Sequence, residues 1–317
     1  MFHSVLKSEL KSFLDFKHGL GFGYVRAEET LRHFDRHVCR VLSHGMKEVN
    51  LQALVESWMT PSANRKRATL SSYLGIVRQF CLFRRRFDPG SFVPTAQWVP
   101  QANGAAFVPY IFSRNEIRRL LRQIAQLRGS PMQRKSARML LLVLYCTGLR
   151  FGEAARLQVR DLDLRRRILC VRESKGRTRL IPFGSELARE FGRYLRQRGL
   201  SPLSLEAPLL ISFQGKPFST NLISWVVRQW LRRAGMKSDH GRSGPRPYDL
   251  RHSFAVHRLS RWYRQGIAVA ERLPWLSVYM GHLNLLGTET YLTTTPELMA
   301  LASRRFEARF RRCQIPT

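Results

Sequence analysis

Acidic side chains are scarce in this sequence of 317 residues, in which 22 Asp and Glu stand against 54 Lys and Arg. Lysine is scarce too: nine of the basic residues are Lys and 45 are Arg. The formal net charge of +32 attracts polyanions, and guanidinium groups bind phosphate oxygens in pairs. The composition therefore predicts a nucleic-acid partner. Codon use in a GC-rich genome is an alternative source of part of the arginine excess, but it does not explain the shortage of acids.

Cysteine is too rare and too scattered to organise the fold. No pair forms a Cys-x-x-Cys motif, which argues against a disulfide framework or a zinc site and favours a reducing cytosol. The five residues are Cys39, Cys81, Cys146, Cys170 and Cys313. Long apolar runs are missing as well, since the longest, residues 139–146, is too short to span a bilayer and the N-terminus has no apolar signal core. We expect a soluble cytoplasmic protein, associated with the nucleoid.

Proline and glycine gather in residues 88–110, where no period persists, and this stretch predicts a linker at 91–110. Before it, apolar residues recur at helical spacing in two runs. These are Leu31, Phe34, Val38, Val41 and Leu42, and then Leu70, Tyr73, Leu74, Val77 and Phe80. We therefore expect a small, basic, all-helical domain at residues 1 to about 90.

After the linker, the pattern predicts a domain that is mostly helical with a small antiparallel sheet. Ser113 and Glu116 form a capping box, with Phe112 and Ile117 spaced as a hydrophobic staple. Further helices are expected at about 133–146, 151–158, 185–198 and 220–234, the last ended by Gly235. Residues 167–172 and 178–182 are β-type runs, which predict a hairpin with Lys175 and Gly176 at its tip.

Five short segments of this second domain stand out together. They are TGLRFGE at 147–153, the hairpin around Lys175, YDLRH at 248–252, MGH at 280–282 and TY at 290–291. Each is weak evidence alone, but in this order and spacing they resemble the tyrosine recombinase (phage integrase) family. The resemblance covers residues 111–317, and the helical N-terminal domain resembles that family's core-binding domain, a DNA clamp. The fold expected is mainly α with a small antiparallel β-sheet.

The resemblance implies a DNA cleavage and rejoining reaction that needs no cofactor. Tyr291 would attack a phosphodiester and form a 3′-phosphotyrosine, while Arg150 and Arg251 bind the non-bridging oxygens bidentately. A free tyrosine has a pKa of about 10, and the surrounding cations are expected to lower it. The bond energy is kept in the phosphotyrosine, so religation would need neither metal nor ATP.

Three further residues have roles by the same resemblance. His282 would add a hydrogen bond to the phosphate, Lys175 would protonate the leaving 5′-oxygen, and Glu153 would brace the active-site arginine and histidine. Each residue also has a plain structural explanation when taken singly. Lys175 fits a solvated turn, Tyr291 a core position, and Glu153 an ordinary helix surface.

One position departs from the family pattern. The second box usually reads His-x-x-Arg, and here Tyr248 occupies its first position. A phenol donates hydrogen bonds to phosphate but is a poor proton acceptor at neutral pH. The usual candidate general base is therefore missing, and the cationic surroundings, His282 or a water are the alternatives. His252 follows Arg251 as in the family, where that position is normally structural.

The DNA-binding surface is less sharply defined by the sequence. Basic residues of the first domain and the hairpin are expected to contact phosphates, although each fits ordinary solvated surface equally well. They are Arg65, Lys66, Arg67, Arg78, Arg177 and Arg179. The amphipathic segment 296–312 is expected to pack on a neighbouring protomer as an assembly helix, with packing on its own domain as the alternative. The resemblance implies a homotetramer on double-stranded DNA with inverted-repeat core sites.

The biological role stays open among several alternatives. Integration, excision or transposition of a mobile element is the leading hypothesis, because of Tyr248 and the arginine content. No separate arm-site-binding domain is apparent ahead of the helical one, which disfavours arm-binding phage integrases. A chromosome or plasmid dimer resolvase would use the same chemistry. A type IB topoisomerase shares the residue set, and a non-enzymatic nucleic-acid-binding protein would need only the charge.

Overall fold

The computed structural model describes residues 1–43, 50–60, 67–95, 98, 108–174, 177–199, 205–241, 243–282, 284–289, 291–292 and 296–313. The chain divides into two compact units, Met1–Ala106 and Phe107–Thr317, and the division falls within the stretch predicted as a linker. None of the helices described is both long enough and apolar enough to cross a membrane.

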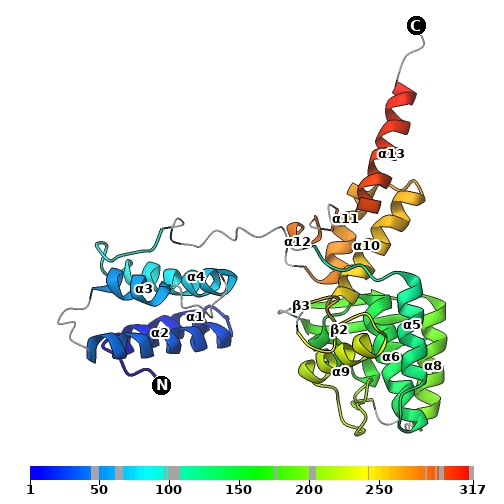
Figure 1. The fold of residues 1–317 in the computed structure, drawn as a ribbon, viewed down its shortest axis with the longest axis horizontal. Coiled ribbons are helices and arrows are strands. Elements are labelled where there is room, and N and C mark those ends of the chain that lie inside the picture. The colour runs from blue at the N-terminus through cyan, green and yellow to red at the C-terminus, as the bar shows by residue number, and fades with distance from the viewer. Residues whose placement is uncertain are drawn as a thin grey trace. The chain divides into compact units, whose positions relative to one another are not determined.

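The first unit is all-helical in its described part (Figure 1). It consists of α1 (Lys7–Gly19), α2 (Val25–Ser43), α3 (Leu51–Met59) and α4 (Arg67–Arg84). Helix α2 packs against the other three, and α1 also contacts α4. The residues with helical spacing form the core, in which Leu31, Phe34, Val38, Leu74, Val77 and Phe80 are fully buried. The predicted helical character of this unit is confirmed.

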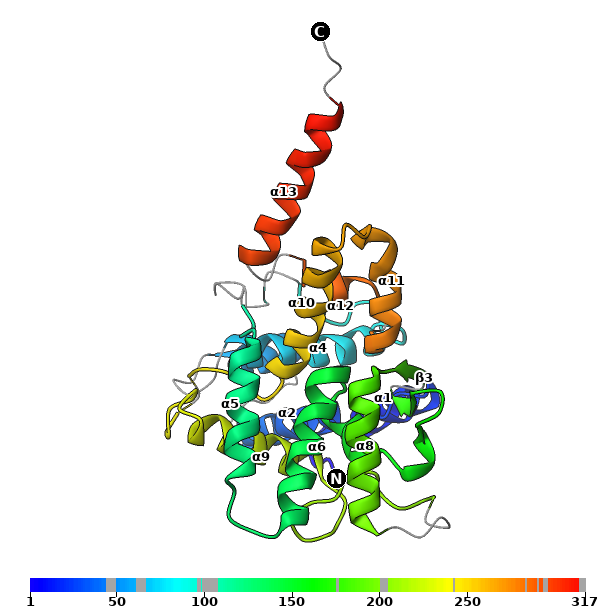
Figure 2. The same cartoon turned by 90° about the vertical axis from the view of Figure 1, so that its right-hand side faces the viewer.

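A group of helices around α6 forms the body of the second unit. Helices α5 (Arg114–Ala125), α6 (Pro131–Thr147) and α8 (Ser185–Arg198) lie side by side (Figure 2). Helix α9 (Thr220–Arg233) packs against α5. The predicted capping box of Ser113 and Glu116 opens α5, and a second one, of Ser130 and Gln133, opens α6. Phe112 and Ile117 are buried in one cluster, as the staple requires.

A small antiparallel sheet lies between α7 (Phe151–Arg156) and α8 in the chain. Strands β1 (Leu162–Asp163), β2 (Ile168–Ser174) and β3 (Arg177–Pro182) pair in the order β1-β2-β3, with Val171 opposite Arg179. The predicted hairpin is confirmed. Its tip, Lys175 and Gly176, lies outside the described residues. The two-residue strand β1 and the 3₁₀ turn Val159–Asp161 before it were not predicted.

The last helices carry the remaining motifs. They are α10 (Asp249–Arg264), α11 (Val269–Met280), α12 (Leu286–Glu289) and α13 (Pro296–Cys313). Helix α10 connects them to the body, because it packs against α6, α11 and α13. Helix α13 begins on its own unit, where Leu298 is buried, and then extends away from α10 (Figures 1 and 2). Farther along it, Phe306 and Phe310 are exposed by 72% and 58%.

Candidate active site

The site is built where two helices end. Helix α6 stops at Gly148 and α11 stops at Gly281, and both glycines adopt left-handed backbone, with φ of 62° and 66°. A Cβ atom at Gly148 would lie 2.6 Å from the Phe254 ring, and one at Gly281 would lie 2.7 Å from an Arg179 nitrogen. Glycine is therefore required at both positions, by backbone angle and by space. Each helix end also leaves carbonyl groups without a partner inside the helix.

Three arginines donate to the carbonyls at these two ends. Arg251 donates from Nη1 to the Gly148 carbonyl and from Nη2 to the Met280 carbonyl. Arg150 Nη2 lies 2.7 Å from the Gly281 oxygen, and Arg179 Nε lies 2.8 Å from the Tyr279 oxygen. Cations are favourable at the C-terminal ends of helices, where the macrodipole is negative. The arrangement explains how Arg251 can be only 2% exposed.

Glu153 is a buried carboxylate that ties two of these arginines together. It accepts from Arg150 Nη1 at 2.9 Å and from the Arg150 backbone N–H at 2.8 Å. Arg179 donates to both of its oxygens, at 3.0 and 2.8 Å. The contact with Arg150 is the one expected from the resemblance. Two guanidinium groups offset the cost of burying one carboxylate, which holds the cation group in a fixed geometry.

Arg179 requires a correction. The prediction that it contacts DNA phosphates is wrong, because its side chain is 8% exposed and its three nitrogens donate to Glu153 and the Tyr279 carbonyl. Its physical role is to neutralise Glu153. By contrast Arg177, two residues earlier on β3, is exposed.

His282 follows Gly281 directly and meets Arg251. Its Nε2 lies 3.2 Å from Arg251 Nη2, and its Nδ1 lies 2.6 Å from the Thr288 hydroxyl. A guanidinium can only donate, so Nε2 acts as the acceptor and Nδ1 carries the proton. This contact places the imidazole directly beside Arg251.

Tyr291 lies against the same group of residues. It is 5% exposed within a cluster of apolar residues from α10, α11 and α13. Its hydroxyl is 3.2 Å from His252 Nδ1, and its ring stacks on that of His282 at 6.1 Å between centroids. Burial raises the pKa of Tyr291 above the ordinary tyrosine value, and the Arg251 guanidinium opposes that shift. The expectation of a lowered pKa is therefore wrong for the protein without DNA, because desolvation outweighs the nearby cations.

The sequence model of the phage integrase family matches residues 111–297, which contain all of these side chains. The chain belongs to the phage integrase family of tyrosine recombinases. It is 31% identical over 307 residues to the putative integrase/recombinase y4rE of Sinorhizobium fredii, covering 96% of each chain. It is 27% identical over 232 residues to tyrosine recombinase XerC of Staphylococcus haemolyticus, covering 73% of this chain and 72% of that one.

The fold matches that of solved tyrosine recombinases. The Tn1549 transposon integrase in complex with transposon right end DNA superposes with a TM-score of 0.67 at 16% identity, covering 97% of this chain and 99% of that chain. Members of this family cleave and rejoin DNA strands, and this recombinase is an enzyme of that kind.

Tyr248, the departure from the family pattern, lies beside the nucleophile candidate. It immediately precedes α10, is 37% exposed, and packs its ring edge-on against Phe151 and His252 at 5.9 and 5.4 Å. His252 in turn lies 5.5 Å from the Tyr291 ring. Sequence reasoning assigned His252 a structural role and missed this contact. The sequence holds no signal for it, because a histidine follows the arginine in the family pattern as well.

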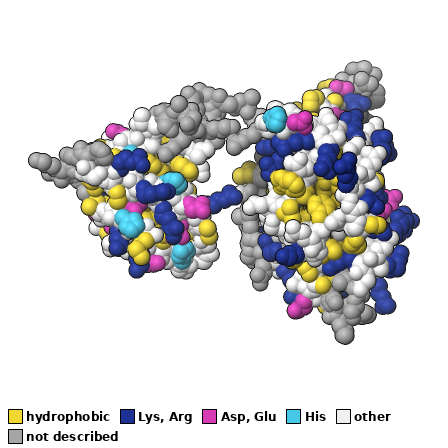
Figure 3. Space-filling view, turned by 60° about the horizontal axis from the view of Figure 1, so that its bottom comes forward, with side chains coloured by type: hydrophobic (Ala, Val, Ile, Leu, Met, Phe, Trp, Pro, Cys, Tyr) yellow, Lys and Arg dark blue, Asp and Glu magenta, His cyan; other side chains and the backbone are white. Residues whose placement is uncertain are grey.

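The other predicted residues are distributed as follows. Lys175, Arg65 and Lys66 lie outside the described residues, and α4 begins at Arg67, whose side chain is not described. Arg78 donates from Nε to the Pro94 carbonyl at 3.0 Å, which fixes one edge of its guanidinium on its own unit. Arg177 is exposed on β3. Lysine and arginine side chains are spread over the face of each unit seen in Figure 3.

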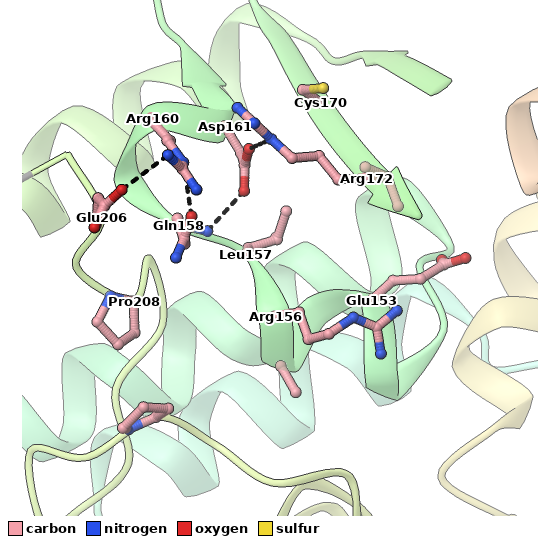
Figure 4. A pocket seen from close by; sticks show the side chains of 13 residues that line it. Glu153, Arg156, Leu157, Gln158, Arg160, Asp161, Cys170, Arg172, Glu206 and Pro208 are labelled. Carbon is pink, nitrogen blue, oxygen red and sulfur yellow. Dashed lines mark hydrogen bonds and ion pairs between the residues drawn. The ribbon is translucent and has the colours of Figure 1, made fainter. Parts of the chain in front are cut away.

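A neighbouring pocket of about 530 Å³ shares Glu153 with the site (Figure 4). Two of its three arginines are paired: Arg160 donates to Glu206 at 3.0 Å, and Arg172 donates to Asp161. Arg251, His282 and Tyr291 are not among its lining residues, so this pocket is not where the chemistry is expected. Within the described part of the chain, no group of three His, Cys, Asp or Glu side chains could hold a metal ion.

Proposed function

We propose that this chain is a site-specific recombinase that cleaves and rejoins DNA through a 3′-phosphotyrosine at Tyr291, and that it integrates, excises or transposes a mobile element. The observation that carries the proposal is the meeting of Arg150, Arg251, His282 and Tyr291. They come from separate stretches of the chain and gather at the ends of α6 and α11.

Arg150 and Arg251 would bind the scissile phosphate. A guanidinium has five N–H donors, and Arg150 commits two of them, to Glu153 and to the Gly281 carbonyl. The remaining donors are held in place by those contacts, so charge developing on the phosphate oxygens meets donors that need no reorganisation. Loss of one such donor typically costs about a hundredfold or more in rate.

Lys175 would protonate the leaving 5′-oxygen from the hairpin tip. Tyr291 Oη forms a bond to phosphorus, the P–O5′ bond breaks, and the 5′-oxygen leaves as a hydroxyl. The phosphotyrosine retains the energy of the phosphodiester, so a 5′-hydroxyl of another strand can reverse the step without a cofactor.

The first unit would hold double-stranded DNA as a clamp. Its basic residues Arg65, Lys66, Arg67 and Arg78, with Arg177 of the hairpin, are the proposed phosphate contacts. The net charge of +32 supports this, because neutralised phosphates release counterions and so drive binding.

Helix α13 would join protomers into a homotetramer on inverted-repeat core sites. Its first turns pack on their own unit through Leu298, while Phe306 and Phe310 stack on each other at 6.4 Å and stay exposed. Exposed aromatic pairs on a projecting helix favour burial against a second copy. Packing on its own unit, the alternative, accounts for Leu298, for the Arg264–Glu297 ion pair and for Arg305, which donates to the Gly266 and Ile267 carbonyls, but it leaves Phe306 and Phe310 exposed.

Dimer resolution is the second candidate role, because XerC is similar over 73% of this chain. The mobile-element role is favoured by likeness to y4rE over 96% of each chain. A strand-transfer assay that offers both a separate target DNA and a second copy of the same site separates these two roles. A mobile-element enzyme joins element ends to a separate target, whereas a resolvase exchanges strands only between two copies of one site. Relaxation of a plasmid without any specific site would instead indicate topoisomerase activity.

A suicide substrate tests the chemistry. Nicked duplexes that carry the inverted repeats flanking the coding sequence are incubated with the full chain, and a covalent protein–DNA band is scored. Tyr291→Phe should lose the band while keeping DNA binding in a mobility-shift assay. A band retained by Tyr291→Phe would overturn the assignment of the nucleophile.

A further inference from the structure

We propose that His252 accepts the phenol proton of Tyr291 during cleavage and returns it during religation, in place of the histidine that Tyr248 has replaced. The inference rests on the proposed function, since it requires Tyr291 to be the nucleophile.

The contact that carries it joins the reacting atom to a ring nitrogen. Tyr291 Oη lies 3.2 Å from His252 Nδ1, within reach for direct proton transfer. His252 lies in the first turn of α10, directly after Arg251, so one helix presents both an anion-binding group and a proton acceptor. Tyr248 also packs edge-on against the His252 ring, at 5.4 Å between centroids.

The alternatives at this site are less suited to take the proton. His282 lies with its ring plane 24° from that of Tyr291, so it stacks on the phenol rather than directing a nitrogen lone pair at the hydroxyl. Its Nε2 already accepts from Arg251, and its Nδ1 donates to Thr288. Tyr248 is a phenol and a poor acceptor at neutral pH.

Burial and two nearby arginines favour the neutral form of His252. Burial lowers its pKa below the ordinary histidine value, and the Arg246 and Arg251 guanidiniums act in the same direction. Asp249 opposes them, but it is paired with Arg246 at 3.3 Å. Among the described residues, the phenols of Tyr248 and Tyr291 also lie against the ring. A neutral imidazole whose Nδ1 faces the Tyr291 hydroxyl is the form that a general base requires.

The step balances without any further reactant. As Tyr291 Oη bonds to phosphorus, its proton moves to His252 Nδ1 and leaves an imidazolium, while the 5′-oxygen departs with a proton from the general acid. In religation the incoming 5′-hydroxyl loses its proton to that acid's conjugate base. His252 then returns the proton to the departing Tyr291 oxygen.

The test measures the single-turnover rate of covalent adduct formation against pH, with the full chain and the nicked duplex that traps the unaltered protein. His252→Ala should slow cleavage by about a hundredfold or more at pH 7 with DNA binding retained. The unaltered protein should lose activity only below the ordinary histidine pKa of about 6.5. The variant should instead gain rate with each pH unit, as the phenolate fraction rises.

Two comparisons separate a proton acceptor from a structural residue. Tyr248→His in the His252→Ala background restores an imidazole next to the site and should recover much of the rate. A duplex with sulfur in place of the bridging 5′-oxygen has a leaving group that needs no proton, so Lys175→Ala should recover on it and His252→Ala should not. Recovery of His252→Ala on that duplex would overturn the proposal.

A matched control uses His257→Ala, a second half-buried histidine of α10 that hydrogen-bonds to Tyr145 at 3.1 Å. It should cleave at the unaltered rate, and melting temperatures of both variants show whether each is folded. If folded His252→Ala cleaves at the rate of the unaltered protein, this inference is wrong and the proposed function is unaffected. Adduct formation by Tyr291→Phe would sink both.

Discussion

The active site of the catalytic unit has two sides, and different kinds of interaction hold their residues in place. The cation side, defined as Arg150, Glu153, Arg179 and Arg251, is fixed by charged hydrogen bonds to the carbonyl groups that end α6 and α11. The nucleophile side, defined as Tyr248, His252 and Tyr291, is positioned by ring packing and by the hydrogen bond between Tyr291 and His252. Changes on the cation side should therefore reduce stability and rate together. Changes on the nucleophile side should reduce rate alone.

Arg179→Met is expected to have the largest effect on stability. It removes three hydrogen bonds and leaves the buried Glu153 with one fewer cation, which typically costs about 3–5 kcal/mol. Urea unfolding followed by circular dichroism measures it. Adding Glu153→Gln removes the uncompensated charge and should recover part of the loss. A cost below about 1 kcal/mol would mean that the cation side is not held by this pairing.

Gly281→Ala should come next, with Gly235→Ala as its matched control. Both glycines have φ of 66°, but a Cβ at Gly235 would meet nothing within 4 Å, whereas one at Gly281 would lie 2.7 Å from Arg179 Nη1. The control should lose about 1 kcal/mol for the backbone angle alone. Gly281→Ala should lose about 2–3 kcal/mol and also slow cleavage, since the Gly281 carbonyl holds Arg150. Equal losses of stability for the two variants in thermal melts would show that a Cβ at position 281 does not clash with Arg179.

Tyr291→Phe should change stability by less than about 1 kcal/mol while abolishing the covalent adduct, because it removes one hydroxyl from a largely apolar cluster. Its pH dependence gives a second readout. Burial raises the pKa of Tyr291, so the folded chain keeps that proton after the unfolded chain has lost it. Above about pH 10 the unaltered protein should therefore lose stability relative to Tyr291→Phe. If the stability of the unaltered protein and that of Tyr291→Phe decline in parallel with rising pH, the pKa of Tyr291 is not raised.

Arg177→Ala should have the smallest effect on folding. Its side chain is exposed, so the free energy of unfolding should not change. If Arg177 contacts one phosphate, the slope of log affinity against log salt should fall by about 0.9. Fluorescence anisotropy at several salt concentrations measures the slope. An unchanged slope would remove Arg177 from the proposed DNA surface.

Much of the fold follows from local sequence rules. Helix α8 has the bounds predicted from its apolar spacing, and Gly235 follows α9 as its stop signal. The two-residue β1 and the four-residue α12 are too short to show a period, so tertiary pairing alone defines them.

The site was predictable in its residue types and less so in its contacts. Arg150, Arg251, His282 and Tyr291 meet, as the motif order implies. The sequence could not distinguish Arg179 from Arg177, because only the position of Glu153 in three dimensions makes one of them a buried partner. It also could not show that burial would outweigh the cations at Tyr291, since desolvation depends on the packing of α10, α11 and α13.

The contacts between the arginines and the helix-end carbonyls determine when the site can form during translation of the chain. Arg150 binds a carbonyl 131 residues later in the chain, and Arg251 joins one that lies 103 residues earlier. The Gly148 carbonyl at the end of α6 therefore lacks its Arg251 donor until α10 has been translated and has docked. The group of arginines that would bind the phosphate therefore forms only once α10 and α11 have both docked. A nascent or truncated chain that stops before α11 has no assembled phosphate site with which to cut DNA.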